Sequence, residues 1–386
     1  MKYLAKTLYG LESILAKELE EAGASAIEKL NRAVSFNGDL KLLYKANYCL
    51  RTAMSVLVPV AEFRISSAED LMKKSMSVRW DRYMSVDQTF SVVPVVNSPL
   101  FRHTGYAALV LKDAIADWFR VRAGRRPSVD VSDPHLVFNL HISGNMVTVS
   151  IDSSVVPLYR RGYRKEQGTA PLNEILAAGI ILLSGWNGSV PMLDPMCGSG
   201  TFPVEACLIA CGIPPGKYRN FFGFQKWKNY DCRLFDEVKK ESEPVGRAAP
   251  AAICGSDISD DAVSQAGKNV ASAGLSDLVK IEKHDFSKLR ARSPEGFIFM
   301  NPPYGQRIKT PAMDSFYSMI GSTLKHNFPD HKAFIISSDM EALKHVGLKR
   351  SRKLTLYNGS LRCSLMEYNL YSGSRKARND FPEMAV

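Results

Sequence analysis

The sequence contains few cysteines, and none of them stands in a metal-binding pattern. Seven cysteines occur among 386 residues, and no pair has the Cys-x-x-Cys spacing. Such a sparse and odd-numbered set indicates neither a zinc site nor a disulfide framework, so we expect no metal. Cys207 and Cys211 stand four apart in a helical pattern, where small buried side chains are favoured over a metal site. Reduced thiols fit a cytoplasmic location, which we therefore expect.

Long apolar runs are also absent. No run of about eighteen apolar residues occurs, so no membrane span and no membrane partner are expected. The first six residues, MKYLAK, lack the apolar core and the small-residue cleavage site of a signal peptide. There is no internal repeat and no low-complexity segment. These absences favour a folded globular protein with a reducing environment.

Charge and length give two weaker indications. Fifty lysine and arginine residues against thirty-nine acidic residues give a net charge of +11 and a pI near 9.2. This excess favours a polyanionic partner, although many basic enzymes bind no nucleic acid. A chain of 386 residues is long for one hydrophobic core, so two or more domains are expected.

The N-terminal part predicts two α+β units. In the first, strands at residues 3–5 and 33–36 alternate with helices that start near Leu11 and Asp39. The second unit combines one clear helix, residues 105–121, with four strands. Those strands are predicted at 55–60, 89–95, 136–142 and 146–151. The first unit carries no catalytic constellation.

From residue 170 onward helices and strands alternate, which predicts a Rossmann-like, doubly wound sheet. A helix is expected at 173–184. Strands are expected at 190–193, 252–256, 279–282, 297–300 and 332–337, with two closing strands at 354–357 and 364–370. The charged, Pro- and Ala-rich segment 239–250 is interpreted as a surface loop.

A glycine-containing motif, Asp194-Pro195-Met196-Cys197-Gly198-Ser199-Gly200-Thr201, follows the first of these strands. A glycine turn between a strand and a helix lets the backbone approach a ligand closely. The motif lacks the Gly-x-Gly-x-x-Gly spacing of dinucleotide-binding proteins. A carboxylate at Asp194 suits a cationic amino-acid tail better than a pyrophosphate. A plain strand–helix connection is the alternative interpretation.

Two further acidic residues stand at strand ends. Asp257 follows residues 253–256, where a carboxylate can accept hydrogen bonds from ribose hydroxyls. Asp285 follows residues 279–283 and can accept from an adenine amine, with Phe286 beside the ring. Because ligands of open parallel sheets bind at the carboxyl ends of the strands, these residues are expected to share one site with the glycine motif. The set predicts S-adenosylmethionine as the cofactor.

A second motif, Asn301-Pro302-Pro303-Tyr304, follows the strand-like segment Phe297–Met300. An exocyclic base amine is a poor nucleophile because its lone pair is delocalised into the ring. The Asn301 side-chain oxygen and the Pro302 backbone oxygen can accept its two hydrogens, while prolines hold the turn. Tyr304 can stack on a base removed from its helix. The motif therefore predicts methylation of a base amino nitrogen, and a Pro-Pro turn ending a strand is the plain alternative.

Two basic segments are candidates for RNA contact. The first ends the predicted helix 105–121 and carries Arg120, Arg122, Arg125 and Arg126. Stabilisation of the helix C-terminus and contact with phosphates both explain these arginines. The second is the connector 157–165, which carries Arg160, Arg161, Arg164 and Lys165 among aromatic residues. It is either a solvated linker or a segment that contacts RNA.

Both motifs resemble those of class I S-adenosylmethionine-dependent amino-methyltransferases. The segments Arg161-Gly162-Tyr163-Arg164 and Ala170-Pro171-Leu172-Asn173-Glu174 resemble the entry to the catalytic domain of THUMP-domain RNA guanine-N2 methyltransferases. Residues 98–103 and 112–115 are similar to THUMP sequence. The most similar type is the ribosomal large-subunit methyltransferase L type with a single catalytic domain. We expect a ferredoxin-like segment at 1–50, a THUMP domain at 51–156, a basic linker at 157–169 and a methyltransferase domain at 170–386.

The resemblance implies transfer of a methyl group to guanine N2 in structured RNA, with 23S rRNA as the expected substrate. The implied catalytic residues are Asn301, Pro302, Pro303 and Tyr304. The implied cofactor-binding residues are Asp194, Pro195, Met196, Cys197, Gly198, Ser199, Gly200, Thr201, Asp257, Ile258, Asp285, Phe286, Ala170, Pro171 and Leu172. Three alternatives stay open: a tRNA guanine-N2 methyltransferase, a DNA adenine methyltransferase, and a non-catalytic RNA-binding assembly factor.

Overall fold

The computed structural model of the chain describes residues 1–165, 172–244, 250–303 and 310–372. These residues form two compact units. The first contains most of residues 1–160 together with the later segment 215–242. The second contains residues 161–214 and the chain from 243 onward, joined by the short segment 8–10.

Unit 1 is built on a seven-stranded sheet with the order β2-β3-β1-β4-β7-β6-β5. All neighbours are antiparallel except β5 and β6. The predicted strand at 55–60 extends to Arg64 as β4. Strand β2 was not predicted, because its side chains are mostly exposed and show no apolar alternation. The strands are β1 (Lys2–Lys6), β2 (Ser25–Leu30), β3 (Ala33–Asn37), β4 (Ser55–Arg64), β5 (Phe90–Asn97), β6 (Leu136–Ser143) and β7 (Met146–Asp152).

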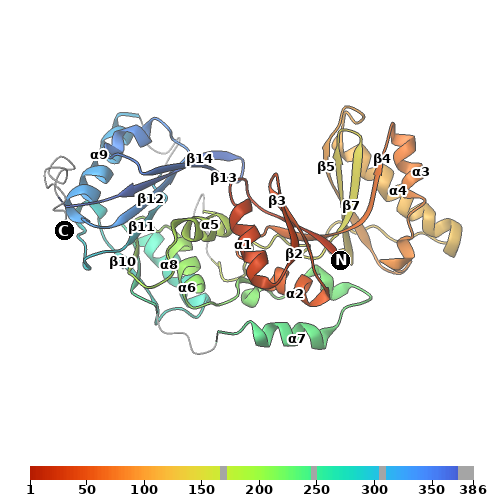
Figure 1. Cartoon of the computed structure of the whole chain (residues 1–386), viewed down its shortest axis with the longest axis horizontal. Helices are drawn as coiled ribbons and strands as arrows, with labels where there is room; N and C mark the ends of the chain where they lie inside the picture. The colour runs from red at the N-terminus through yellow and green to blue at the C-terminus, as the bar shows by residue number, and fades with distance from the viewer. Residues whose placement is uncertain (166–171, 245–249, 304–309, 373–386) are drawn as a thin grey trace, which may run out of the picture. The chain divides into compact units, whose positions relative to one another are not determined.

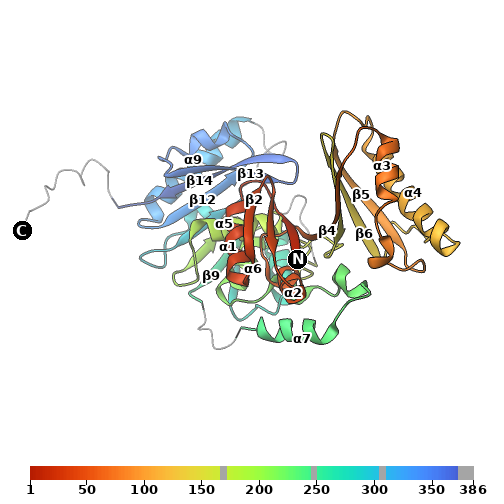
Figure 2. The same cartoon turned by 45° about the vertical axis from the view of Figure 1, so that its right-hand side comes forward.

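Helices divide unit 1 into two apolar cores. Figures 1 and 2 both show α3 and α4 side by side against the β4–β7 part of the sheet. Trp80, Leu111 and Phe138 are fully buried in this core. The other core lies between α1, α2 and strands β1 and β3. The helices are α1 (Glu12–Ala22), α2 (Leu40–Cys49), α3 (Ala68–Ser75), α4 (Thr104–Ala123) and α7 (Cys232–Glu241), with 3₁₀ turns at Trp80–Arg82, Pro215–Tyr218 and Gly223–Lys226.

The segment 215–242, which lies within the predicted methyltransferase domain, 170–386, packs into the α1–α2 core of unit 1. Aromatic contacts hold this segment in the core: Phe224 stacks on Tyr44 with ring centroids 4.4 Å apart, and Phe235 packs edge-on against Phe224 with ring centroids 5.0 Å apart. The predicted loop 239–250 begins too early, because α7 continues to Glu241.

Unit 2 is built on a seven-stranded sheet with the order β10-β9-β8-β11-β12-β14-β13, which confirms the predicted doubly wound sheet. The first five strands are parallel, while β14 is antiparallel to both β12 and β13. The strands are β8 (Met192–Asp194), β9 (Ile253–Asp257), β10 (Val279–Lys283), β11 (Phe297–Met300), β12 (Lys332–Ser337), β13 (Arg352–Asn358) and β14 (Leu361–Asn369).

Alternating apolar residues on β11 place helices on both faces of this sheet. Phe299 packs on Phe202 of α6 with ring centroids 5.5 Å apart, whereas Ile298 and Met300 belong to the core beneath α9. Figure 1 accordingly shows α6 and α9 on opposite sides of the sheet. The helices are α5 (Glu174–Ser184), α6 (Thr201–Ala210), α8 (Asp260–Ser272) and α9 (Thr310–Asn327), with 3₁₀ turns at Phe286–Lys288 and Ala342–Val346.

Candidate active site

A pocket of about 840 Å³ lies at the carboxyl ends of strands β8, β9, β10 and β11. The sheet brings together the strand-end residues Asp194, Asp257, Asp285 and Asn301, which are far apart in the sequence. The volume of this pocket is in the usual range for a cofactor or small-molecule site. The predicted residues that line it are Leu172, Asp194, Pro195, Met196, Cys197, Gly198, Ser199, Thr201, Asp257, Ile258, Asp285, Phe286, Asn301, Pro302 and Pro303.

The glycine loop has the geometry that its residues predict. Gly198 and Gly200 both have positive φ angles, +51° and +82°, which side-chain-bearing residues rarely adopt. A Cβ at Gly200 would also lie 3.1 Å from the Cβ of Ala266 on α8. The two glycines therefore let the chain turn from β8 directly into α6, so that the first turn of this helix faces the pocket.

Asp194 is the most deeply buried acidic residue of the pocket wall. Its side chain is 2% exposed, and its Oδ1 accepts one hydrogen bond, from the Met196 N–H at 3.2 Å. Burial raises the pKa of Asp194 well above its ordinary value, and the nearby Asp257 carboxylate raises it further. A buried carboxylate whose desolvation is offset by so little hydrogen bonding favours a cationic ligand group.

The carboxylates of Asp257 and Asp285 both accept hydrogen bonds from nearby backbone N–H groups. Asp257 accepts from the Gly198 and Ser259 N–H groups, both at 3.0 Å, so it ties the glycine loop to the start of α8. Asp285 accepts from the Ser287 hydroxyl at 2.7 Å and its N–H at 3.0 Å, and these bonds lower the pKa of Asp285. Each carboxylate retains further lone pairs for a ligand hydroxyl or amine. Phe286 lines the pocket but stacks on Phe328 in the core.

Asn301 provides the clearest chemical signal in the pocket. Its Oδ1 is buried and accepts no hydrogen bond from any residue that the structure describes. An unpaired buried acceptor costs about 1–3 kcal/mol, so a group of this kind is suited to accept a hydrogen bond from a ligand. Pro302 is buried beside it. Of the other predicted residues, Tyr304, Ala170 and Pro171 lie outside the described residues.

The residues present fit S-adenosylmethionine. The pocket combines a buried carboxylate for the ammonium group of an amino-acid tail, carboxylates at two strand ends for hydroxyl or amine donors, and a glycine loop that permits close approach. Within the described ranges, no group of three or more His, Cys, Asp or Glu residues is arranged to hold a metal ion. No described helix is long and apolar enough to cross a bilayer.

Several pocket residues were not singled out by the sequence. They come from α8, the end of β10, α9, the end of β12 and the start of β14: Gln265, His284, Phe316, Met319, Ser338 and Leu361. His284 stands beside Asp285 and could have been found from that position. The others had no detectable signal, because only the packing of α8, α9 and β14 and the position of the β12 end bring them to the pocket.

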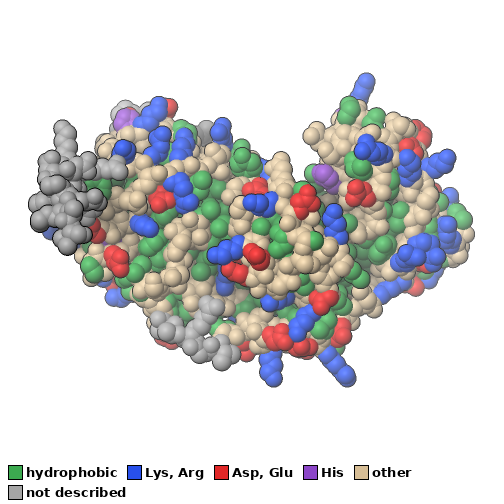
Figure 3. All heavy atoms as spheres, in the orientation of Figure 1, with side chains coloured by type: hydrophobic (Ala, Val, Ile, Leu, Met, Phe, Trp, Pro, Cys, Tyr) green, Lys and Arg blue, Asp and Glu red, His purple; other side chains and the backbone are tan. Residues whose placement is uncertain are grey.

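The arginines predicted at the end of α4 are on the surface of unit 1. The side chains of Arg120, Arg125 and Arg126 are 49–62% exposed. Arg125 pairs with Asp87 at 2.5 Å, Arg126 pairs with Asp117, and the Arg122 guanidinium lies 4.4 Å from the Trp118 ring centroid. Figure 3 shows Lys and Arg side chains gathered over this end of α4.

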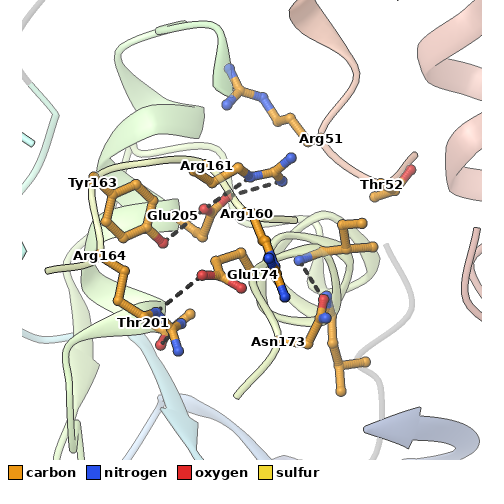
Figure 4. A network of polar contacts seen from close by, with 12 residues as sticks. Arg51, Thr52, Arg160, Arg161, Tyr163, Arg164, Asn173, Glu174, Thr201 and Glu205 are labelled. Atoms are coloured by element: carbon orange, nitrogen blue, oxygen red, sulfur yellow. Dashed lines mark hydrogen bonds and ion pairs between the residues drawn. The ribbon is translucent and has the colours of Figure 1, made fainter. Parts of the chain in front are cut away.

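The connector arginines correct a sequence-based prediction. Arg161 and Arg164 were expected to contact RNA, but their side chains are only 1% and 8% exposed. Arg161 pairs with Glu205 of α6 and Arg164 with Glu174 of α5 (Figure 4). Buried arginines of this kind hold protein segments together and cannot reach a phosphate. Arg160 and Lys165 are exposed, so the prediction for them stays open.

Comparisons with known proteins place each part of the chain. Residues 2–57 match the RlmL ferredoxin-like domain, residues 66–152 match the THUMP domain, and residues 161–367 match the model described as "RMKL-like, methyltransferase domain". A Synechocystis protein named "Putative RNA methyltransferase slr0064" is 37% identical over 96% of this chain and 97% of its own length.

Two further matches extend this result. The Ribosomal RNA large subunit methyltransferase K/L of Psychromonas ingrahamii is 35% identical over 96% of this chain, which spans only 50% of that protein's length. The crystal structure of SMU.472, "a putative methyltransferase complexed with SAH", has a TM-score of 0.86 and 29% identity, with 97% of this chain and 99% of that chain covered. The predicted family and fold class are confirmed: the chain belongs to the RMKL-like methyltransferases, with RlmL-type ferredoxin-like and THUMP domains preceding the catalytic domain.

Proposed function

We propose that this protein transfers a methyl group from S-adenosylmethionine to the exocyclic N2 of a guanine in large-subunit ribosomal RNA. The observation that carries the proposal is the buried, unpaired Oδ1 of Asn301, which faces no described donor in a pocket otherwise suited to the cofactor. The amine of a purine base supplies the missing donor. The name of the K/L relative and the THUMP domain support ribosomal RNA as the substrate, and with it a cytoplasmic location.

In this proposal Asn301 and Pro302 activate the amine by accepting its hydrogens. The Asn301 Oδ1 takes one N–H and the Pro302 carbonyl takes the other, so the nitrogen lone pair is directed at the methyl donor. S-adenosylmethionine would supply an electrophilic methyl group, whose bond to sulfur breaks as the bond to nitrogen forms, so that S-adenosylhomocysteine leaves and the methylated amine then loses one proton to solvent. Catalysis then rests on position and on preorganised acceptors. Tyr304, which lies outside the described residues, is proposed to stack on the extruded base.

The remaining pocket residues are proposed to hold the cofactor. Asp194 accepts from the ammonium of the aminoacyl group, and the 194–201 loop encloses that group. Asp257 binds the ribose hydroxyls, and Asp285 accepts from the adenine amine. The SAH complex of SMU.472 supports this assignment of the site.

The test of the proposed function is methylation of unmodified RNA with labelled S-adenosylmethionine, followed by nucleoside analysis. Ribosomal RNA, tRNA and DNA are offered in parallel. N2-methylguanosine in ribosomal RNA is the expected product. N2-methylguanosine in tRNA alone would identify tRNA, and not ribosomal RNA, as the substrate. N6-methyladenine would contradict the assignment of guanine as the target base. Tight RNA binding with no methyl transfer would identify a non-catalytic binding protein.

Cofactor affinity should depend on pH through Asp194. Burial raises the pKa of this carboxyl in the free protein, whereas a cationic ligand group lowers it. Affinity for S-adenosylmethionine is therefore expected to fall as the pH drops through the raised pKa, because the acid must ionise to bind. Calorimetry in two buffers of different ionisation enthalpy measures the linked proton release. Asp194→Asn should bind more weakly and lose this pH dependence. Proton release that persists in the variant would contradict the assignment.

Reversing the charges of Arg125 and Arg126 should weaken RNA binding. Both side chains are exposed at the end of α4, so Arg125→Glu/Arg126→Glu is expected to lower RNA affinity and flatten its salt dependence. Affinity for S-adenosylmethionine should not change. Lys17→Glu/Lys344→Glu makes the same charge change at two other exposed, paired cations and serves as the control. Equal losses in the two double variants would show only a general charge effect.

A further inference from the structure

The Arg161-Gly162-Tyr163-Arg164 segment is packed against one face of α6 (Figure 4). Glu205 of α6 is fully buried and receives hydrogen bonds from Tyr163 at 3.0 Å and from the Arg161 Nε at 3.4 Å. Thr201 stands four residues earlier, on the same face of the helix, and accepts from Arg164. The helix that starts at the glycine loop is therefore held at two successive turns by one short segment.

Arg164 joins the start of α5 to two residues of the pocket wall. Its Nε lies 3.0 Å from the Glu174 Oε1, and both side chains are only 8% exposed. Its Nη2 donates to the Leu172 carbonyl at 3.0 Å and to the Thr201 Oγ1 at 2.8 Å. Both Leu172 and Thr201 line the pocket. A planar guanidinium can reach all three acceptors at once, whereas a lysine ammonium carries its donors on a single atom.

A second connection runs from the next residue to the glycine loop. The Lys165 N–H donates to the Asn269 Oδ1 at 2.9 Å, and the Asn269 Nδ2 donates to the Ser199 carbonyl at 3.0 Å. Asn269 is fully buried on α8. The chain at 164–165 is thus bonded to both ends of the Ser199–Thr201 turn, directly through Arg164 and indirectly through Asn269.

We infer that Arg164 is a positioning residue for the cofactor: through Thr201 and Leu172 it holds the glycine loop in the conformation that binds S-adenosylmethionine. It does not contact RNA. This inference rests on the proposed function, because it takes the pocket to be the cofactor site. Preorganisation of the loop lowers the ordering cost of binding, so its loss should appear in cofactor affinity.

Two mild substitutions test the inference without leaving a buried charge unpaired. Arg164→Lys keeps the positive charge beside Glu174 but removes the fork that reaches Thr201. Thr201→Val removes only the hydroxyl acceptor and keeps the shape of the side chain. Each should weaken S-adenosylmethionine binding about tenfold, which corresponds to about 1.4 kcal/mol. The KM for S-adenosylmethionine should rise by the same factor, while kcat at saturating cofactor and RNA affinity stay near wild type.

Arg352→Lys, at a more exposed arginine, is the control for Arg164→Lys. Arg352 also pairs with a glutamate, Glu367 at 2.9 Å, and also donates to a carbonyl, that of Leu183 at 2.8 Å. It belongs to unit 2 but does not line the pocket. Its replacement tests whether the loss of any bridging arginine weakens cofactor binding. The melting temperature of each variant is measured in parallel.

Four outcomes are decisive. Weaker cofactor binding in Arg164→Lys and Thr201→Val, with the control unchanged, supports the inference. Unchanged cofactor affinity in both variants overturns it, as does a loss that appears in RNA affinity instead. If the wild-type protein itself does not bind S-adenosylmethionine, the proposed function fails and the inference fails with it, so the wild-type titration separates the two.

Discussion

Methyl transfer by Asn301→Ala should be about a hundredfold to a thousandfold slower than by the wild-type protein. The substitution removes the buried Oδ1, which accepts no hydrogen bond from any described residue and which we propose binds the target amine. The pocket wall at Asp194 and Asp257 is not altered. Binding of S-adenosylmethionine and of RNA should therefore stay near wild type, so that the defect lies in the chemical step.

Single-turnover transfer of a labelled methyl group to unmodified ribosomal RNA measures this effect, beside a titration with the cofactor. Asn187→Ala is a suitable control, because Asn187 is exposed, accepts only a local hydrogen bond from the Ser189 N–H, and does not line the pocket. Wild-type turnover by a folded Asn301→Ala protein would remove the basis of the proposed mechanism.

Glu205→Ala should lower the stability of unit 2 by about 3–5 kcal/mol. The side chains of Glu205 and Arg161 are 0% and 1% exposed. Removing the carboxylate takes away the buried negative charge that Glu205 places beside the Arg161 guanidinium, and it removes an acceptor of the Tyr163 hydroxyl. The desolvation cost of the guanidinium charge, rather than the attraction itself, accounts for the size of the effect.

Thermal and urea unfolding of the full chain measure this loss. The double variant Arg161→Met/Glu205→Met removes both charges and should recover much of the stability that Glu205→Ala loses. Glu341→Ala removes a partner of the exposed Lys344 and should change stability little, since surface ion pairs contribute little. If the double variant is no more stable than Glu205→Ala, the loss of the buried counter-charge beside Arg161 is not the source of the destabilisation.

Local patterns in the chain were sufficient to predict most of unit 2. The apolar runs at Phe297–Met300 and Lys332–Ser337 are strands with the predicted bounds, because buried parallel strands are apolar on both faces. Helix α5, which was predicted at 173–184, begins after its N-cap residue Asn173, whose Oδ1 accepts a hydrogen bond from the Ile175 N–H at 2.9 Å. The motifs 194–201 and 301–304 both follow the carboxyl ends of strands. Because ligands of open parallel sheets bind at these ends, the sequence was enough to predict that the two motifs share one site.

The residues that tertiary contacts alone define were not predictable in the same way. An arginine in a basic connector has the same local sequence pattern whether its side chain contacts water, a phosphate or a buried glutamate. The partner of Arg161 is Glu205, 44 positions away along the chain. The partner of Arg164 is Glu174, 10 positions away. Likewise, nothing local in the segment 215–242 shows that its aromatic rings pack on Tyr44. The sequence by itself determined the strands and the glycine turn, and it contains the motif that we propose binds an amine, because these features depend on residues close together in the chain. The tertiary structure decided which charges are buried and which side chains complete the pocket, because burial and pairing depend on residues that only folding brings together.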